Sequence, residues 1–329
     1  TEKTIDDKIF SNKHSLNAYW KECSEEKVWL VGDILDNGNW KTMSKNWTEY
    51  GYGSKDEREW KNEFITDMID LLDPKIDFSK HYDGLIVFRA GKKWNYDWST
   101  LGKHTIFTDE GEIEIAMSFL AEDDIAIDND YASHESGHGL FSLVHANSQS
   151  ILSGKIRAYG DWYENRGGYY ALLDGLHKYI LGWLDISQIE IITVSGNYWL
   201  DQRELSSDGA KLLVIFLGYA DDGGLILYYF EYFRGLGEFD SQLSFSNKNE
   251  TIDPNNLVLP RKYKLEGTDD SLLYVASDDG NDLLDMESQE FCDSDYENLE
   301  HYGVCVQVLE KIGTEEESKA KVKITLTED

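Results

Sequence analysis

The sequence predicts an α+β protein of two domains, a mixed α/β domain over residues 1–185 followed by a β-sandwich over residues 186–329. Two observations predict this division. In the first half, buried-strand patterns and a helical pattern alternate along the chain. From Trp183 onwards, apolar residues fall into short alternating runs separated by turn residues, which is typical of a sandwich. A chain of 329 residues is long enough for about two domains with cores of their own.

The first domain is predicted to open with a strand, a helix and a second strand. Residues 27–32 and 82–89 are apolar runs that each predict a buried strand. Between Trp40 and Leu72, apolar residues recur at helical spacing, and the pattern stops at Asp73-Pro74. Strand, helix and strand in this order predict a parallel crossover unit. A loop is expected over residues 92–105, after which residues 111–117 alternate charged and apolar side chains, as a half-exposed strand does.

The pattern H-E-x-x-H follows, formed by His134, Glu135 and His138. Residues four apart lie on one face of a helix, so both imidazoles could bind one Zn²⁺, with Glu135 as the general base toward a water. A bare pattern of this kind occurs by chance in roughly one chain of this length in a hundred, and an ordinary helix with two exposed or capping histidines is the alternative. Gly137, Gly139 and the apolar residues after them favour a close-packed helix, and therefore a metal site.

The third ligand is open between two predictions. His145 lies seven residues past His138 and is followed by a polar stretch. If the chain leaves the helix after about Phe141 and turns sharply, His145 can reach the zinc. If the helix continues, His145 lies ~10 Å further along the axis. A carboxylate would then have to serve, with Glu164 and Asp161 as candidates. We favour His145.

These residues resemble the metzincin-like zinc peptidases of the gametolysin and immune inhibitor A type. The motif of that family is H-E-x-G-H-x-x-G-x-x-H, commonly followed by Ala, and this chain fits it with one residue inserted before His145. Phe141 stands near the place of the usual glycine. Residues 159–168 and 172–184, the latter ending in Leu-Gly-Trp-Leu, resemble the second half of the same domain, without its methionine. Residues 228–234 resemble the β domain that follows it in the family.

The resemblance implies a secreted zinc endopeptidase that hydrolyses peptide bonds in a protein or peptide substrate. His134, His138 and His145 would bind Zn²⁺, Glu135 would be the general base, and a tyrosine from residues 159–170 would stabilise the transition state. In the family, an edge strand above the cleft pairs with the substrate backbone, and residues 111–117 are a candidate for it. The alternative is a weakened or inactive scaffold that acts as a binding or adhesion protein, because the glycine and the methionine are missing.

Composition excludes some partners. A net charge of −32 rules against nucleic-acid or anionic-membrane binding, which needs a basic patch. No apolar run approaches the ~20 residues of a membrane span, and the chain begins without a leader pattern, so we expect any signal or pro-segment to have been removed. The oligomeric state stays open.

Cysteine spacing and acidic clusters complete the sequence-based expectations. Cys292 and Cys305 are expected to pair in an oxidising compartment, which leaves Cys23 as a packed thiol. Acidic clusters at residues 122–130 and 278–282 suit Ca²⁺, although neither has a full loop signature and solvated turns are favoured. The runs expected as strands of the second domain are residues 189–194, 198–200, 211–216, 224–233, 271–275, 303–309 and 319–326.

Overall fold

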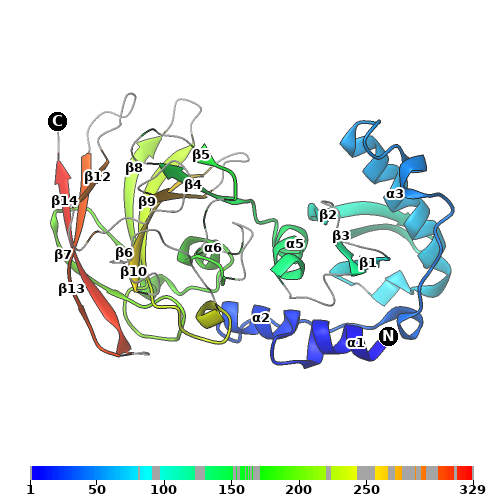
Figure 1. Ribbon diagram of the computed structural model, residues 1–329, viewed down its shortest axis with the longest axis horizontal. Coiled ribbons are helices and arrows are strands. Elements are labelled where there is room, and N and C mark those ends of the chain that lie inside the picture. The colour runs from blue at the N-terminus through cyan, green and yellow to red at the C-terminus, as the bar shows by residue number, and fades with distance from the viewer. Residues whose placement is uncertain are drawn as a thin grey trace. The chain divides into compact units, whose positions relative to one another are not determined.

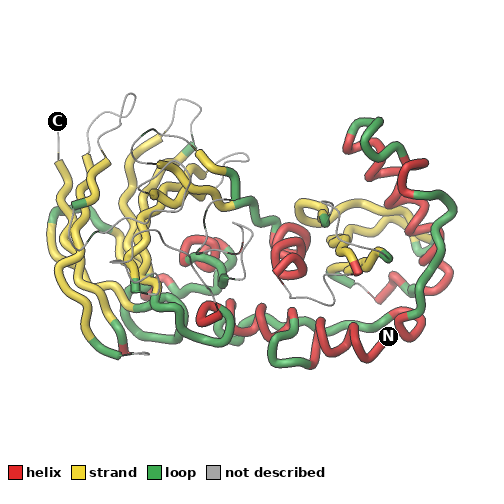
Figure 2. Tube along the Cα trace, viewed as in Figure 1, coloured by secondary structure: helices red, strands yellow, loops and turns green. Residues whose placement is uncertain are grey.

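The structure, a computed structural model, is a mixed α+β protein with several sheets (Figures 1 and 2). Its contacts divide the chain into two compact units, residues 1–16 with 30–143 and residues 17–29 with 144–329. The residues it describes are 2–80, 82–90, 97–122, 130–150, 153, 156–159, 161, 163, 165, 171–219, 224–242, 256–265, 271–275, 286, 290–293, 303–314 and 317–327.

The first unit is built from a long helix and a three-stranded sheet. Its helices are α1 (Glu2–Asp6), a π-helical turn (Asp7–Ser11), α3 (Glu57–Leu72) and α5 (Asp130–Phe141). Short 3₁₀ turns lie at Leu35–Gly38, Trp47–Tyr50, Asp73–Lys75 and Phe78–Lys80. Its strands are β1 (Gly84–Arg89), β2 (Trp98–Thr108) and β3 (Gly111–Ala121).

Helix α3 confirms the predicted helix end at Asp73-Pro74 but not its start near Trp40, because residues 40–56 hold turns and a single 3₁₀ turn and the α-helix begins at Glu57. Asp56 caps it by accepting a hydrogen bond from the backbone N–H of Arg58, and the helix ends where Asp73-Pro74 begins a 3₁₀ turn. The buried face of α3 packs in one cluster with Trp98, Ile115, Met117 and Phe119 of the sheet. Apolar burial at helical spacing therefore stabilises this helix against the sheet. The buried residues of α3 are Trp60, Phe64, Ile65, Met68, Ile69 and Leu72.

The sheet of this unit differs from the predicted one. Residues 27–32 are not a strand, and Trp29 and Val31 are 58% and 84% exposed. The parallel partner of β1 is β3, which also pairs antiparallel with β2 in the order β1-β3-β2. The prediction of a strand at residues 27–32 is wrong, and so is that of a loop over residues 92–105, because β2 begins at Trp98. An apolar run in the sequence does not show whether another strand will be adjacent to pair with it.

Strand β3 was a candidate edge strand, and this prediction is also wrong. It lies in the centre of the three-stranded sheet, between β1 and β2. Its second half is buried throughout, because Ile115, Met117 and Phe119 pack in one cluster with α3 and α5 also contacts this strand. Of the described strands, β1 and β2 form the edges of this sheet.

The second unit holds two sheets. One has seven strands in the order β5-β4-β11-β10-β9-β8-β6, and the other four in the order β12-β13-β14-β7. All seven runs expected as strands are confirmed, and β4, β5, β10 and β12 were not anticipated. The helices are α2 (Leu16–Cys23), α6 (Gly175–Ile180) and the 3₁₀ turns Ile186–Gln188 and Asp240–Gln242. The strands are β4 (Ala146–Ser150), β5 (Ile156–Arg157), β6 (Ile189–Ile191), β7 (Gly196–Asp201), β8 (Leu212–Tyr219), β9 (Leu225–Phe233), β10 (Leu257–Leu265), β11 (Ser271–Val275), β12 (Phe291–Asp293), β13 (Gly303–Ile312) and β14 (Lys319–Thr327).

Both sheets contribute side chains to one hydrophobic core. Tyr228 and Phe230 of β9 share it with Val304 and Val306 of β13 and Val322 of β14. The seven-stranded sheet also includes β4, which pairs parallel with β11 although it precedes residue 186 by many positions. The contacts thus divide the chain after Leu143, whereas we expected the division after residue 185.

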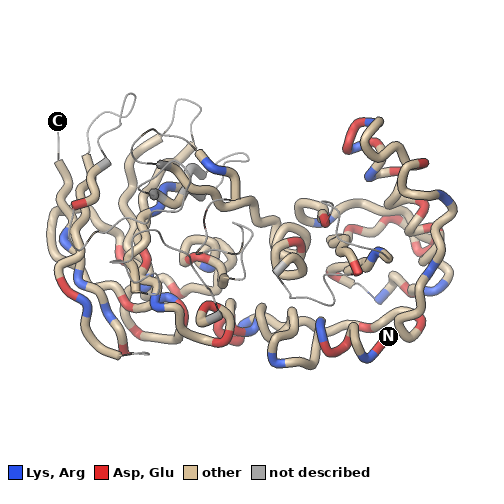
Figure 3. The backbone as a smooth tube through the Cα atoms, viewed as in Figure 1, with Lys and Arg blue, Asp and Glu red and all other residues tan. Residues whose placement is uncertain are grey.

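A chain of buried ion pairs crosses this unit. Arg261 on β10 binds Asp161 and also Glu231 on β9, while Arg203 binds Glu231 and Asp240. All five side chains are almost completely buried, so each charge depends on its neighbours for compensation. Along the described backbone, basic residues lie among acidic ones (Figure 3).

The cysteines follow the sequence-based expectation. Cys292 on β12 and Cys305 on β13 form a disulfide between paired residues. Cys23 is a buried free thiol whose sulfur accepts a hydrogen bond from the backbone N–H of Leu173 at 3.4 Å. None of the described helices is long and apolar enough to cross a membrane.

Candidate metal centre

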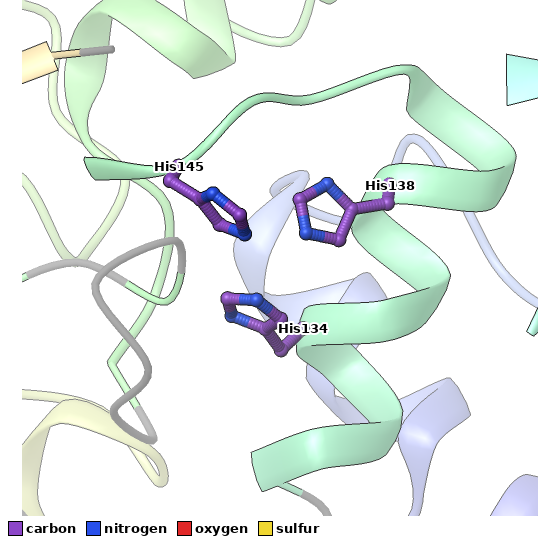
Figure 4. Close-up of side chains that lie close together, drawn as sticks. All are labelled: His134, His138 and His145. Carbon is purple, nitrogen blue, oxygen red and sulfur yellow. The ribbon is translucent and has the colours of Figure 1, made fainter. Parts of the chain in front are cut away.

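The three predicted histidines converge. His134 and His138 project from successive turns of α5, and His145 comes from the segment that follows the helix, so that the imidazoles point toward one another (Figure 4). One ring nitrogen from each lies within 4.8 Å of those of the other two. Among the described residues, this is the one group of metal-binding side chains whose ligand atoms are all chemically available, since the other group includes both disulfide-bonded cysteines.

The chain leaves α5 where the sequence predicted. The helix ends at Phe141, and Ser142 takes a left-handed backbone conformation with φ 56°. The N–H of Ser142 donates to the carbonyl of His138, and the N–H of Leu143 to that of Gly137. This is the hydrogen bonding of a tight helix end, for which glycine is the usual residue. Ser142 therefore supplies the turn that a glycine supplies in the resembled motif.

The same turn fixes one imidazole. The Nδ1 atom of His138 lies 2.6 Å from the carbonyl oxygen of Leu143. Since a carbonyl only accepts, Nδ1 must carry the proton and donate it, which leaves Nε2 with its lone pair. A ring oriented in this way by a backbone carbonyl is the arrangement found for metal-binding histidines.

Glu135 follows His134 on α5, and a side chain of the sheet holds its carboxylate in place. Its side chain is 7% exposed, and its Oε2 accepts a hydrogen bond of 2.9 Å from the hydroxyl of Ser99 on β2. Close packing of helix and sheet allows this contact. A Cβ at Gly139 would lie 3.2 Å from Oγ of Ser118 on β3, so glycine suits the surface where α5 meets the sheet.

His145 packs against an aromatic side chain of its own unit. The ring centroids of His145 and Tyr159 are 4.3 Å apart with the planes tilted by 58°. Tyr159 has φ 55°, and its N–H donates to the side-chain oxygen of Asn147 on β4. Nearby Tyr163 is buried against Phe233 instead.

The alternative carboxylate ligand has a different role. Both oxygens of Asp161 accept hydrogen bonds from Arg261, at 2.6 and 3.1 Å. Burial raises the pKa of Asp161, and the charge of Arg261 opposes that shift. Glu164, the other alternative, lies outside the described residues, as do residues 278–282 and most of residues 122–130, where Ca²⁺ was considered.

Ser99 was missed by sequence reasoning, because the segment around it was expected to be a loop. No local signal marks a serine whose partner lies 36 residues later.

Comparison with known protein families, with curated proteins and with solved structures finds no match to this chain. The chemistry of the site thus rests on its geometry.

Proposed function

We propose that this chain is a secreted zinc-dependent endopeptidase with a metzincin-like catalytic domain. The observation that carries the proposal is the convergence of His134, His138 and His145 beside a buried Glu135. It is the constellation that metal-assisted peptide hydrolysis requires, three neutral nitrogen ligands and one carboxylate base.

The donor set suits Zn²⁺. Ligand nitrogens ~2.1 Å from a tetrahedral ion lie about 3.4 Å apart, and one ring nitrogen of each histidine lies within 4.8 Å of the other two. His138 offers Nε2 because Nδ1 is committed to Leu143. When bound, Zn²⁺ would supply a Lewis acid for a water molecule and for the scissile carbonyl. Imidazole ligands would also accept other transition metals, but geometry with three histidines and an open position is typical of catalytic zinc.

The roles of the other residues follow from their places. Glu135, next to His134 in the chain, would take the proton of the attacking water and pass it to the leaving amine. Tyr159 lies against His145 and is 46% exposed, so it is the described tyrosine best placed to donate a hydrogen bond to the oxyanion. Tyr163 is fully buried and is not a candidate.

Two further features support the rest of the proposal. The two sheets that share one core favour a β-sandwich as the accessory domain. The disulfide Cys292–Cys305 favours an oxidising compartment, and therefore secretion. We propose a protein or peptide as the substrate.

The competing function is that of a binding or adhesion protein that has kept the scaffold. The missing methionine favours it. Ser142 weakens the argument from the missing glycine, because it adopts the left-handed turn itself. A scaffold kept only for binding has no need of a buried base such as Glu135.

The test is zinc analysis of the full chain together with cleavage of a broad peptide library, with and without a chelator. About one zinc per chain and cleavage that the chelator abolishes and added Zn²⁺ restores would support the peptidase. Bound zinc without any cleavage would favour the binding protein.

A further inference from the structure

Strand β2 carries an irregularity beside the candidate site. Ser99 pairs with Ser118 and Lys103 with Ala116, so the three residues 100–102 stand opposite the single residue Met117. The Thr100 hydroxyl accepts a hydrogen bond from the N–H of Met117 at 3.0 Å and donates to the carbonyl of Gly102 at 2.7 Å. A side chain thus replaces the ladder hydrogen bonds that the bulge interrupts. Bulges of this kind redirect side chains next to active sites.

The bulge meets α5 at two points. At its start, Ser99 donates to Oε2 of Glu135 at 2.9 Å. At its end, Gly102 has φ 74°, and a Cβ there would lie 2.5 Å from Oγ of Ser142, the residue that turns the chain toward His145. One short segment of β2 therefore contacts both the candidate base and the turn that leads to the third histidine.

The Ser99 contact determines how a carboxylate is presented. The terminal torsion of a glutamate is broad and soft, so a carboxylate that is not held rotates readily. A general base must come within about 2.6–3.2 Å of the proton it takes, and a misplacement of ~1 Å can cost about 100-fold in rate. A hydroxyl on a rigid strand, donating to one carboxylate oxygen, fixes the plane of that carboxylate before substrate arrives.

We propose that Ser99 is the positioning residue for Glu135, and that the bulge in β2 directs the Ser99 hydroxyl toward the Glu135 carboxylate. This inference rests on the proposed peptidase function and deepens it. Ser99 touches neither the metal ligands nor, in this role, the substrate. It acts through Glu135, so its removal should slow turnover without weakening zinc or substrate binding.

The test compares Ser99→Ala with Ser99→Thr, which keeps the hydroxyl, and with Ser118→Ala, which removes the hydroxyl of the residue paired with Ser99 on β3. Turnover of fluorescently labelled casein and zinc content are measured on the full chain. We expect Ser99→Ala to lower kcat roughly 10- to 100-fold, with KM and zinc content unchanged. Ser99→Thr should restore most of kcat, and Ser118→Ala should match the wild type. An unchanged kcat, or a fall in kcat that parallels a loss of zinc, would overturn the proposal.

A second measurement does not depend on activity. Urea midpoints of metal-free Ser99→Ala, Glu135→Ala and the double variant form a double-mutant cycle. We expect the double variant to shift less than the sum of the two single shifts, since both singles break the same hydrogen bond. Additive shifts would reject the Ser99 contact whatever the activity. Coupled shifts in a chain that cleaves nothing would instead reject the peptidase function, and with it the catalytic role of Ser99.

Discussion

Two of the three candidate zinc ligands are held by different means. His138 is fixed by a hydrogen bond to the carbonyl of Leu143, within its own helix end. His145 lies against Tyr159, and its position depends on the turn at Ser142. The hydrogen bond therefore sets the orientation of the His138 ring in the absence of metal. The turn at Ser142 determines whether the imidazole of His145 reaches the other two.

Replacing Glu135 tests the base alone. We expect Glu135→Ala to lower kcat at least 100-fold, because general base catalysis contributes about 10²–10⁴-fold. Zinc content should stay near one per chain, since no ligand is removed. Metal analysis and the casein assay on the same sample check both points, and undiminished cleavage would refute the assignment.

The third ligand is tested by three variants assayed for bound zinc. We expect His145→Ala to lose zinc affinity, whereas Asp161→Asn and Glu164→Ala keep it. Asn is used at position 161 because its amide oxygen can still accept a hydrogen bond from the buried Arg261, whereas Ala would break this contact altogether, and breaking a buried pair costs about 3–5 kcal/mol. Full zinc affinity in His145→Ala with loss in a carboxylate variant would show that the third ligand is a carboxylate.

Tyr159 provides a test of oxyanion stabilisation. Tyr159→Phe keeps the ring that packs against His145 and removes only the hydroxyl. We expect kcat to fall about 100-fold with zinc content unchanged, as for the loss of one oxyanion donor. Tyr163→Phe is the control, since that side chain is buried against Phe233. Equal activity in Tyr159→Phe and wild type would remove Tyr159 from the mechanism.

Among the elements, α5 and β2 lie in contact at the candidate metal centre. The helix supplies His134, Glu135 and His138, and the bulged strand supplies Ser99 and the glycine that fits beneath Ser142. A helix packed so closely on a strand leaves little space to adjust. We therefore expect small changes in β2 to alter the geometry of the candidate metal site.

Gly102→Ala tests this coupling. The left-handed conformation costs an alanine about 1–2 kcal/mol, and the new Cβ would meet Ser142. We expect a lower Tm and weaker zinc binding. Gly53→Ala is the matched control, because Gly53 has φ 75° and nothing within 4 Å of the added Cβ. It should lower Tm similarly and leave zinc affinity intact. Equal zinc affinity in both variants would contradict the coupling.

On the scale of the whole molecule, the second unit depends on buried charge. Glu204 is almost fully buried, and its Oε1 accepts hydrogen bonds from the N–H groups of Arg234 and Gly235 at 2.6 and 2.9 Å. Burial raises the pKa of Glu204 to about 7, and the charge of Asp240 adds to the shift. The ordinary value of 4.5 applies in the unfolded chain.

The sign of the pH effect follows from this shift. Between pH 4.5 and about 7 the folded chain binds more protons at Glu204 than the unfolded chain does. The stability linked to this group is therefore fully present below pH 4.5 and is lost as the pH rises through about 7. Glu204→Gln keeps the acceptor and removes the charge. We expect it to raise the free energy of unfolding at pH 8 by on the order of 2 kcal/mol and to change it little at pH 4.5. Urea denaturation at both pH values checks this, and an equal effect at the two would contradict it.

Local order was readable from the sequence. Helix α3 and the strands of the second unit were predicted because periodicity reports which face of an element will be buried, and burial drives their formation. The exit of the chain at Phe141 was predicted because the spacing of the histidines allows few geometries. These features depend on residues close together in the chain.

Tertiary structure alone decided what pairs with what. Residues 27–32 have the composition of a strand but do not form one. Strand β4 pairs with β11, which lies more than a hundred residues later in the chain. Ser99 contacts Glu135 only because a bulge in β2 and the packing of α5 bring them together. Strand pairing and buried polar contacts join distant segments, and their free energy depends on which partner arrives. A local sequence pattern does not contain information about that distant partner. The sequence therefore determined the candidate ligands, and the tertiary structure alone determined which contacts position them.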